Sequence, residues 1–112
     1  MKYTAAIEIE PAEAKIINKY MHEEPTDESD CLGEDETITH TAVFSNGYQM
    51  DIKCCGVQYN ENETTNTAWS EAVLFDKQNN QIAYTEPCDT YFGEWQLEAN
   101  GNEYTANVIE AK

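Results

Sequence analysis

The chain of 112 residues is 40% hydrophobic, a length and composition that match one domain with a single core. Its 22 acidic residues face six lysines and no arginine, so the formal net charge at pH 7 is −16. This charge repels nucleic acid and anionic membranes, and together with the lack of arginine it excludes direct nucleic-acid binding.

The first predicted elements are a strand and a helix. Apolar residues alternate with more polar ones over residues 2–10, which predicts a strand with one buried face that ends at Glu10 and Pro11. Pro11 suits the first position of a helix, which we expect over residues 12–21. The helix has one apolar stripe that should lie on the sheet, made of Ile16, Ile17, Tyr20 and Met21.

Two segments are rich in polar residues and predict connections. Residues 22–36 contain eight carboxylates and one strongly apolar side chain, Leu32, so we expect a long acidic connection there. Residues 58–68 are mostly polar and predict a loop with no strand of its own.

Residues 37–54 predict a long β-hairpin that turns at residues 45–47. A two-residue loop would set Phe44 opposite Gln49, whereas a three-residue loop with its glycine in the left-handed region sets Phe44 opposite Tyr48. The second register matches apolar residues with apolar residues, so we expect it. It places one set of side chains on a common face, which the rest of the chain must cover: Ile38, His40, Ala42, Phe44, Tyr48, Met50, Ile52 and Cys54.

A strand buried on both faces is predicted over residues 69–76, because apolar side chains occupy the adjacent positions 72–75. We expect this strand at the centre of the sheet. Residues 77–80 then turn the chain into a strand over residues 81–85, for which two registers fit equally well.

The last hairpin turns at Asn100 and Gly101, the favoured pair for a type I′ turn. The expected opposite pairs are Leu97 with Tyr104, Trp95 with Ala106, Gly93 with Val108, and Glu98 with Glu103. The last pair sets two like charges opposite each other, at a cost of a few tenths of a kcal/mol or more.

These elements predict an α+β fold over residues 1–112, a single domain. One β-α unit is followed by a mostly antiparallel β-meander of about six strands, with the single helix packed on the sheet. No stretch approaches the ~20 apolar residues of a membrane span. The N-terminal residues lack the continuous apolar run of a signal peptide, so we expect a cytoplasmic protein with reduced cysteines.

Four cysteines and two histidines raise the alternative of a small zinc or thiol-redox protein. Structural zinc sites usually take ligands from Cys-x2–4-Cys pairs, whereas Cys54 and Cys55 are adjacent and Cys31 and Cys88 are single. We expect His40 to be a hydrogen-bonded core or edge residue and His22 to complement the helix dipole. No nucleophile motif or phosphate-binding loop is present, so we expect no enzyme, metal site or cofactor.

The net charge is the strongest functional signal, since small domains usually carry a charge of magnitude about 2–8. Carboxylates arranged along a surface resemble a phosphate backbone, and counterion release favours their binding in a Lys/Arg-lined groove. Outward-facing carboxylates are expected at Glu71, Glu94, Glu98, Glu103 and Glu110. The candidate partner-binding residues are Glu23, Glu24, Asp27, Glu28, Asp30, Glu34, Asp35 and Glu36, with Tyr59 and Trp69 as aromatic anchors. In the alternative hypothesis the acidity serves only solubility and the chain is a general protein-interaction module.

The chain resembles small acidic accessory proteins of phages and conjugative elements in Gram-positive bacteria. The likeness rests on the β-α start, the acidic connection, and the segments at residues 44–52, 69–76 and 93–95. It is a likeness of general character and transfers no functional residues. Members with known roles include anti-CRISPR and anti-restriction inhibitors, several of which imitate DNA. The resemblance therefore implies an inhibitor whose partner is a basic nucleic-acid-binding protein, such as a CRISPR effector or a restriction enzyme.

Overall fold

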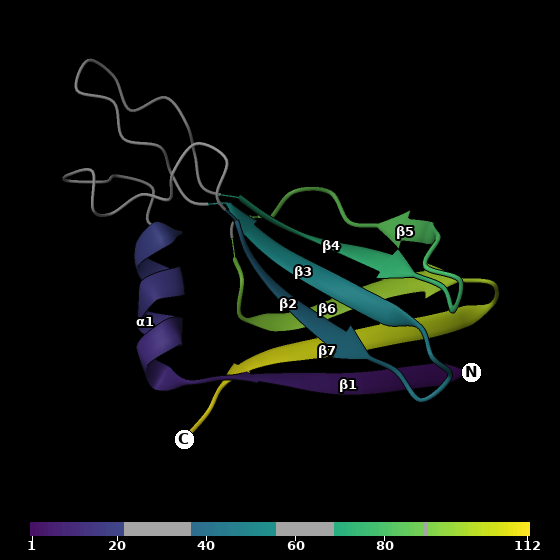
Figure 1. The fold of residues 1–112 in the computed structure, drawn as a ribbon, viewed down its shortest axis with the longest axis horizontal. Coiled ribbons are helices and arrows are strands. Elements are labelled where there is room, and N and C mark those ends of the chain that lie inside the picture. Colours follow the sequence, from purple (N-terminus) through teal and green to yellow (C-terminus); the bar gives the residue numbers. More distant parts are fainter. Residues whose placement is uncertain (22–36, 56–68, 89) are drawn as a thin grey trace, which may run out of the picture.

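The computed structural model describes residues 1–21, 37–55, 69–88 and 90–112, and these form an α+β fold, as predicted. In chain order the elements are β1 (Lys2–Ile9), α1 (Pro11–Tyr20), β2 (Ile38–Val43), β3 (Gln49–Cys55), β4 (Trp69–Phe75), β5 (Gln81–Tyr84), β6 (Gly93–Ala99) and β7 (Asn102–Glu110). Figure 1 shows a β-α unit followed by strands that are mostly antiparallel.

The strands are divided between two sheets, which their patterns did not reveal. One sheet has the order β1-β7-β6 and the other has the order β2-β3-β4-β5. β1 runs parallel to β7, in a register that sets Tyr3 beside Tyr104 and Ile7 beside Val108. Because parallel neighbours point matched positions to the same face, the apolar sides of both strands turn inward together.

The register of the first hairpin is confirmed. Ala42 pairs with Met50 and His40 with Ile52, and the Phe44 amide donates to the Tyr48 carbonyl at 2.8 Å. Gly47 has φ of +90°, a left-handed conformation that costs least at glycine. A three-residue turn therefore fixes which face of β2 and β3 is buried.

The register of the last hairpin is also confirmed, including the pairs of Trp95 with Ala106 and Glu98 with Glu103. Asn100 and Gly101 have φ of +52° and +80°, so both central residues are left-handed, as a type I′ turn requires.

β4 lies between β3 and β5, and Ala72, Val73 and Leu74 are all buried, as expected for a strand covered on both faces. The open question about β5 is resolved by an irregularity: Leu74 pairs with Ala83, but the next residue, Phe75, pairs with Gln81. The register shifts by one residue between these pairs, so β4 and β5 do not keep a single register along their length.

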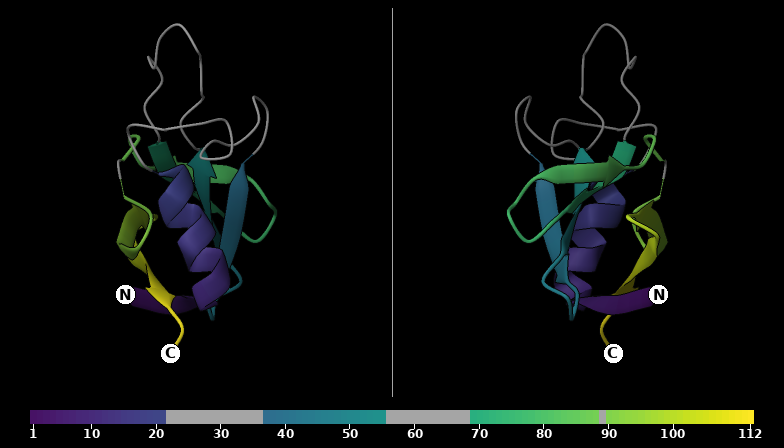
Figure 2. Two further views of the ribbon diagram at one scale, coloured as in Figure 1. Left: turned by 90° about the vertical axis from the view of Figure 1, so that its left-hand side faces the viewer. Right: turned by 90° about the vertical axis from the view of Figure 1, so that its right-hand side faces the viewer.

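The two sheets face each other and enclose the core (Figure 2). β1 lies beside β2 at one pair of edges, and β5 lies beside β6 at the other. We call the end covered by α1 the helix end; there β1 and β3 finish, and β2, β4 and β6 begin. The opposite end, the turn end, holds the turns at residues 45–47, 76–80 and 100–101.

Helix α1 packs into the helix end through a narrower face than the sequence predicted. Ala14 and Ile17 are 1% and 0% exposed, whereas Ile16 is 48% exposed. Tyr20 and Met21 are half-buried. The expectation that Ile16 belongs to the packed face was wrong, because adjacent positions are about 100° apart on a helix and Ala14, three residues before Ile17, takes that place.

Candidate functional site

The proposed partner-binding residues fall largely outside the described part of the chain. Glu23, Glu24, Asp27, Glu28, Asp30, Glu34, Asp35, Glu36 and Tyr59 all lie in residues 22–36 and 56–68. The remaining candidate, Trp69, begins β4 and is half-buried. Its place is at the helix end, where Cys55 is its partner on β3.

The described residues that lead into and out of these segments converge at the helix end. Ile38 pairs with Cys54, and Cys55 pairs with Trp69. An isolated bridge also joins Ser70 to Cys88, with hydrogen bonds of 2.8 Å and 2.7 Å between the two backbones. The described residues next to these segments therefore meet at one end of the four-stranded sheet.

The charge of the molecule is distributed unevenly along the chain. Residues 22–36, 56–68 and 89 hold eight, two and one carboxylates, which is half of the 22 in the chain. All six lysines belong to the other residues. The segments that join the fold at the helix end therefore carry most of the net negative charge.

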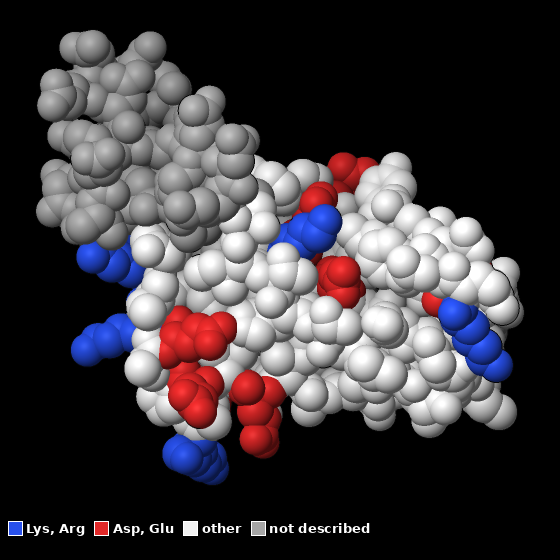
Figure 3. All heavy atoms as spheres, viewed as in Figure 1, with Lys and Arg blue, Asp and Glu red and all other residues white. Residues whose placement is uncertain are grey.

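The described part of the helix end carries exposed charges of both signs (Figure 3). Glu8, Glu10 and Glu13 are all exposed, and acidic side chains gather beside the junction of β1 and α1 in Figure 3. Lys15 and Lys19 are exposed along the helix itself. Of the carboxylates predicted to face outward, Glu94, Glu98 and Glu110 are exposed, and Glu71 and Glu103 are half-buried.

A polar cluster joins α1 to both sheets. The His40 ring lies between two partners, with Nδ1 at 2.6 Å from the Tyr91 hydroxyl and Nε2 at 2.5 Å from Glu13 Oε1. The Tyr91 hydroxyl donates to the Ile52 carbonyl at 3.0 Å. Burial raises the pKa of the Tyr91 phenol far above its usual value, and the nearby Cys54 and Glu13 groups raise it further. Tyr91 therefore stays a neutral hydroxyl.

Sequence reasoning expected His40 to be hydrogen-bonded, which the cluster confirms, but it did not identify the partners. Glu13 and Tyr91 lie 27 and 51 residues away along the chain. The only signal was a histidine on the buried face of a strand, and such a position does not indicate which element supplies the partner.

The described residues bear on the expectation that no metal site is present. No group of three or more His, Cys, Asp or Glu side chains in that part of the chain is placed to hold a metal ion. Cys54 is buried in the core and Cys88 is exposed.

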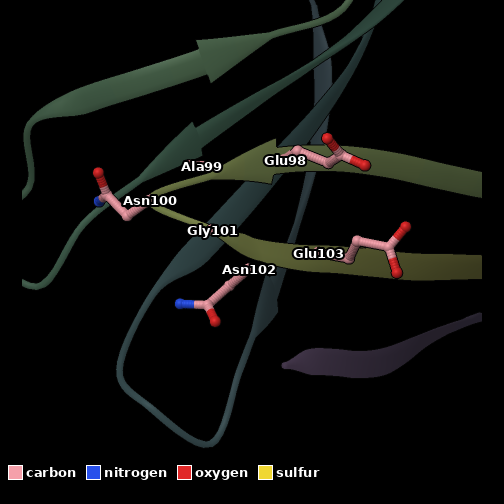
Figure 4. A pocket seen from close by; sticks show the side chains of 6 residues that line it. All are labelled: Glu98, Ala99, Asn100, Gly101, Asn102 and Glu103. Carbon is pink, nitrogen blue, oxygen red and sulfur yellow. The ribbon is translucent and has the colours of Figure 1, made fainter.

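A hollow of about 350 Å³ lies at the turn end, around the tip of the β6–β7 hairpin (Figure 4). Glu98 and Glu103 project beside it from neighbouring strands. Glu103 is already engaged, since it accepts a hydrogen bond from Gln96 at 2.7 Å and lies 3.5 Å from the Lys2 ammonium. Ala99, Asn100, Gly101 and Asn102 complete the lining.

No protein-family model matches the chain, and no curated protein or solved structure is significantly similar to it. Among the described helices, none is long and apolar enough to cross a membrane.

Proposed function

We propose that this chain is a non-enzymatic inhibitor that imitates nucleic acid and binds a basic nucleic-acid-binding protein of host defence, such as a CRISPR effector or a restriction enzyme. It would act in the cytoplasm as an accessory protein of a phage or other mobile element. The observation that carries the proposal is that the segments holding half of the carboxylates join the fold at one end.

The proposed interaction is electrostatic at its core. A groove that binds nucleic acid is lined with Lys and Arg. When these side chains pair with phosphates or with equivalent carboxylates, counterions are released, and their release favours binding. The folded sheets would present the acidic segments together, so that several carboxylates meet one groove. Trp69 at the base of these segments, and Tyr59 within one of them, would supply aromatic contacts of the kind that dominate many interfaces.

The first test is affinity capture from the lysate of a plausible host, followed by elution with excess duplex DNA and then with high salt. A nucleic-acid-binding protein that elutes with DNA would support the proposal, because DNA and this chain would then compete for one groove. Partners that resist both elutions, or that have no basic groove, would contradict it.

The second test changes the position of charge while keeping its amount fixed. Lysine substitution of Asp27, Glu28, Asp30 and Glu34 should abolish binding of the captured partner. The matched control is lysine substitution of Glu8, Glu94, Glu98 and Glu110, which are exposed on β1, β6 and β7 and which change the net charge equally. The control should retain most of the binding. Equal losses in both variants would show that no particular surface is recognised.

Salt provides an independent check of the mechanism. Raising ionic strength from physiological levels to 0.5 M shortens the screening length from about 8 Å to roughly 4 Å. The dissociation constant should therefore rise steeply with salt in the wild type. Binding that survives 0.5 M salt would instead favour a general interaction module whose acidity serves only solubility.

A further inference from the structure

Two asparagines of the chain are followed directly by glycine. Asn46 precedes Gly47 in the β2–β3 turn, and Asn100 precedes Gly101 in the β6–β7 turn, so both pairs lie at the turn end. An asparagine in this position is open to a reaction within the chain, because glycine has no side chain to hinder approach to its backbone nitrogen. The two pairs differ in how firmly the fold holds the reacting atoms.

The reaction is the loss of the asparagine side-chain amide. The backbone nitrogen of the glycine attacks the asparagine carbon Cγ and forms a new N–Cγ bond. The bond from Cγ to Nδ2 breaks, and Nδ2 leaves as ammonia after taking up the proton of the glycine amide. Water then opens the remaining five-membered succinimide. Cleavage of the new N–Cγ bond gives aspartate, whereas cleavage at the backbone carbonyl gives isoaspartate, in which the main chain runs through the asparagine side chain.

The fold holds both sides of the reaction at Asn46. Its Nδ2 donates to the Tyr104 hydroxyl at 2.8 Å, and its Oδ1 accepts from the Tyr48 backbone amide at 3.2 Å. The Gly47 amide, which would be the nucleophile, donates to the Phe44 carbonyl at 3.0 Å. These hydrogen bonds must break before the glycine nitrogen can reach the side-chain carbon.

The Asn100-Gly101 pair is held much less firmly. Asn100 is exposed, and its Nδ2 lies 3.4 Å from the Tyr48 hydroxyl, beyond the usual range for an N–H···O hydrogen bond. Strand pairing ends with Ala99 opposite Asn102, so the Gly101 amide lies beyond the last pair of the ladder. A brief opening of the hairpin tip therefore suffices to bring the Gly101 nitrogen to Asn100 Cγ.

The surroundings of the two glycines differ in the same direction. The Lys77 side chain covers Gly47, since its Cγ lies 3.2 Å from the place where a β-carbon on Gly47 would stand. No atom of the described residues lies within 4 Å of the equivalent place on Gly101. Asn100 and Gly101 also line the hollow at the hairpin tip, which admits the water that opens the succinimide (Figure 4).

We infer that Asn100 is a site of spontaneous deamidation through attack by the Gly101 amide, and that the fold protects Asn46 from the same reaction. Either product adds a carboxylate to a hollow already lined by Glu98 and Glu103, and takes the formal net charge of −16 one unit further. Isoaspartate also lengthens the backbone of the two-residue turn between β6 and β7. This inference concerns the chain alone and does not depend on the proposed partner.

The test is incubation of the full chain at neutral pH, with aspartate and isoaspartate at the two sites followed by peptide-resolved mass spectrometry. In the folded protein, Asn100 should be converted about a hundredfold faster than Asn46, because each hydrogen bond that must break at Asn46 slows the attack several-fold. In concentrated urea the two sites should react at similar rates, since both are then Asn-Gly pairs in an unfolded chain. Similar rates in the folded protein would overturn the inference, as would an Asn100 that is converted only in urea.

Two tyrosine variants test the cause of the difference, after circular dichroism has shown that both are folded. Tyr104→Phe keeps the ring but removes the hydroxyl that accepts from Asn46, so conversion of Asn46 should become about fivefold faster. Tyr48→Phe is the matched control, because it removes the hydroxyl near Asn100 and should change the conversion of Asn100 by less than about twofold. An unchanged Asn46 in Tyr104→Phe, or a strongly accelerated Asn100 in Tyr48→Phe, would contradict the inference.

Discussion

The two ends of the molecule close the core by different means. At the turn end, Tyr3 and Tyr48 both stack on Tyr104, with ring centroids 5.2 and 5.1 Å away. Phe44 meets the Tyr104 ring edge-on at 5.1 Å. At the helix end, α1 buries only two residues fully, and the hydrogen bonds of His40 complete the closure.

The two ends therefore have different expected roles, one in the stability of the fold and the other in contact with a partner. The aromatic closure of the turn end is insensitive to charge, and aromatic pairs add about 0.5–1.5 kcal/mol each beyond their buried area. The helix end depends on polar contacts and receives the most acidic segments of the chain. We therefore expect the turn end to anchor the fold and the helix end to respond to its surroundings.

The largest effect is expected from Tyr104→Ala, which removes the ring shared by the aromatic contacts of the turn end. Tyr104 is fully buried, so the change should lower the free energy of unfolding by about 4 kcal/mol. Urea unfolding measures this loss. Tyr84→Ala is the control, because Tyr84 is 64% exposed and its loss should change stability by less than about 0.5 kcal/mol. Similar losses of stability in both variants would contradict the expectation that the aromatic contacts of the turn end anchor the fold.

The next effect tests how α1 is held. Ile17→Ala should lower the free energy of unfolding by about 3 kcal/mol, because the Ile17 side chain is fully buried against the sheets. Ile16→Ala, one position away and 48% exposed, should cost less than about 0.5 kcal/mol beyond any change in helix propensity. Thermal and urea unfolding of the pair compare them directly. A larger loss for Ile16→Ala would mean that the helix packs through its other face.

A smaller effect is expected from Asn46→Ala, which removes two hydrogen bonds of the turn end. The Asn46 side-chain nitrogen Nδ2 donates to the Tyr104 hydroxyl at 2.8 Å, and the side-chain oxygen Oδ1 accepts from the Tyr48 backbone amide at 3.2 Å. The loss in unfolding free energy should be about 1 kcal/mol. Ser45→Ala, at the exposed neighbouring position, should be close to neutral. Equal values for the two variants would show that solvent replaces both bonds at no cost.

A stabilising change is expected from Glu98→Lys. Glu98 lies opposite Glu103 across the β6–β7 hairpin, so a lysine would replace a repulsive pair with an attractive one. The gain should be about 0.3 kcal/mol and should shrink in 0.5 M salt. Glu98→Gln should give a smaller gain, and no gain from either variant would indicate that solvent already screens the pair.

The smallest effect concerns Asp76 at the turn end. A hydrogen bond from the Asn80 backbone amide, with further bonds from the Asn80 side chain and the Gln78 backbone amide, holds the pKa of Asp76 below its usual value. A lowered pKa contributes stability at neutral pH that is lost as the pH falls through the folded pKa, below about pH 4. Asp76→Asn should therefore be slightly less stable than the wild type at pH 7, and the difference should vanish in acid. A difference independent of pH would assign the effect to shape alone.

Both hairpin registers could be predicted because apolar matching and turn chemistry act within short stretches of sequence. The three-residue turn before Tyr48 and the Asn100-Gly101 pair each admit one register that buries the apolar side. The same local information could not place β1. Its parallel partner, β7, begins at Asn102, and no turn connects them, so nothing nearby in the sequence specifies the pairing.

The sequence predicts the charge of the candidate site but not the contacts between its side chains. The acidic segments are visible in composition alone. The packed face of the helix was predicted wrongly at Ile16, because Ile16 and Ile17 are equally apolar and the sequence does not show which of the two is buried. The small side chain of Ala14 gave no sign that it belongs to the packed face. The partners of His40 come from elements that only the tertiary fold brings together.

The parallel pairing of β1 with β7 also has a consequence for how the chain folds. β1 forms its backbone hydrogen bonds with β7, so β1, which is made before the other described strands, must wait for the strand over residues 102–110. Closing so long a loop is entropically costly, and folding rates fall as contacts become more distant in sequence. The four-stranded sheet, whose neighbours follow one another in the chain, is therefore expected to form early, and the docking of β1 on β7 to be among the last steps of folding.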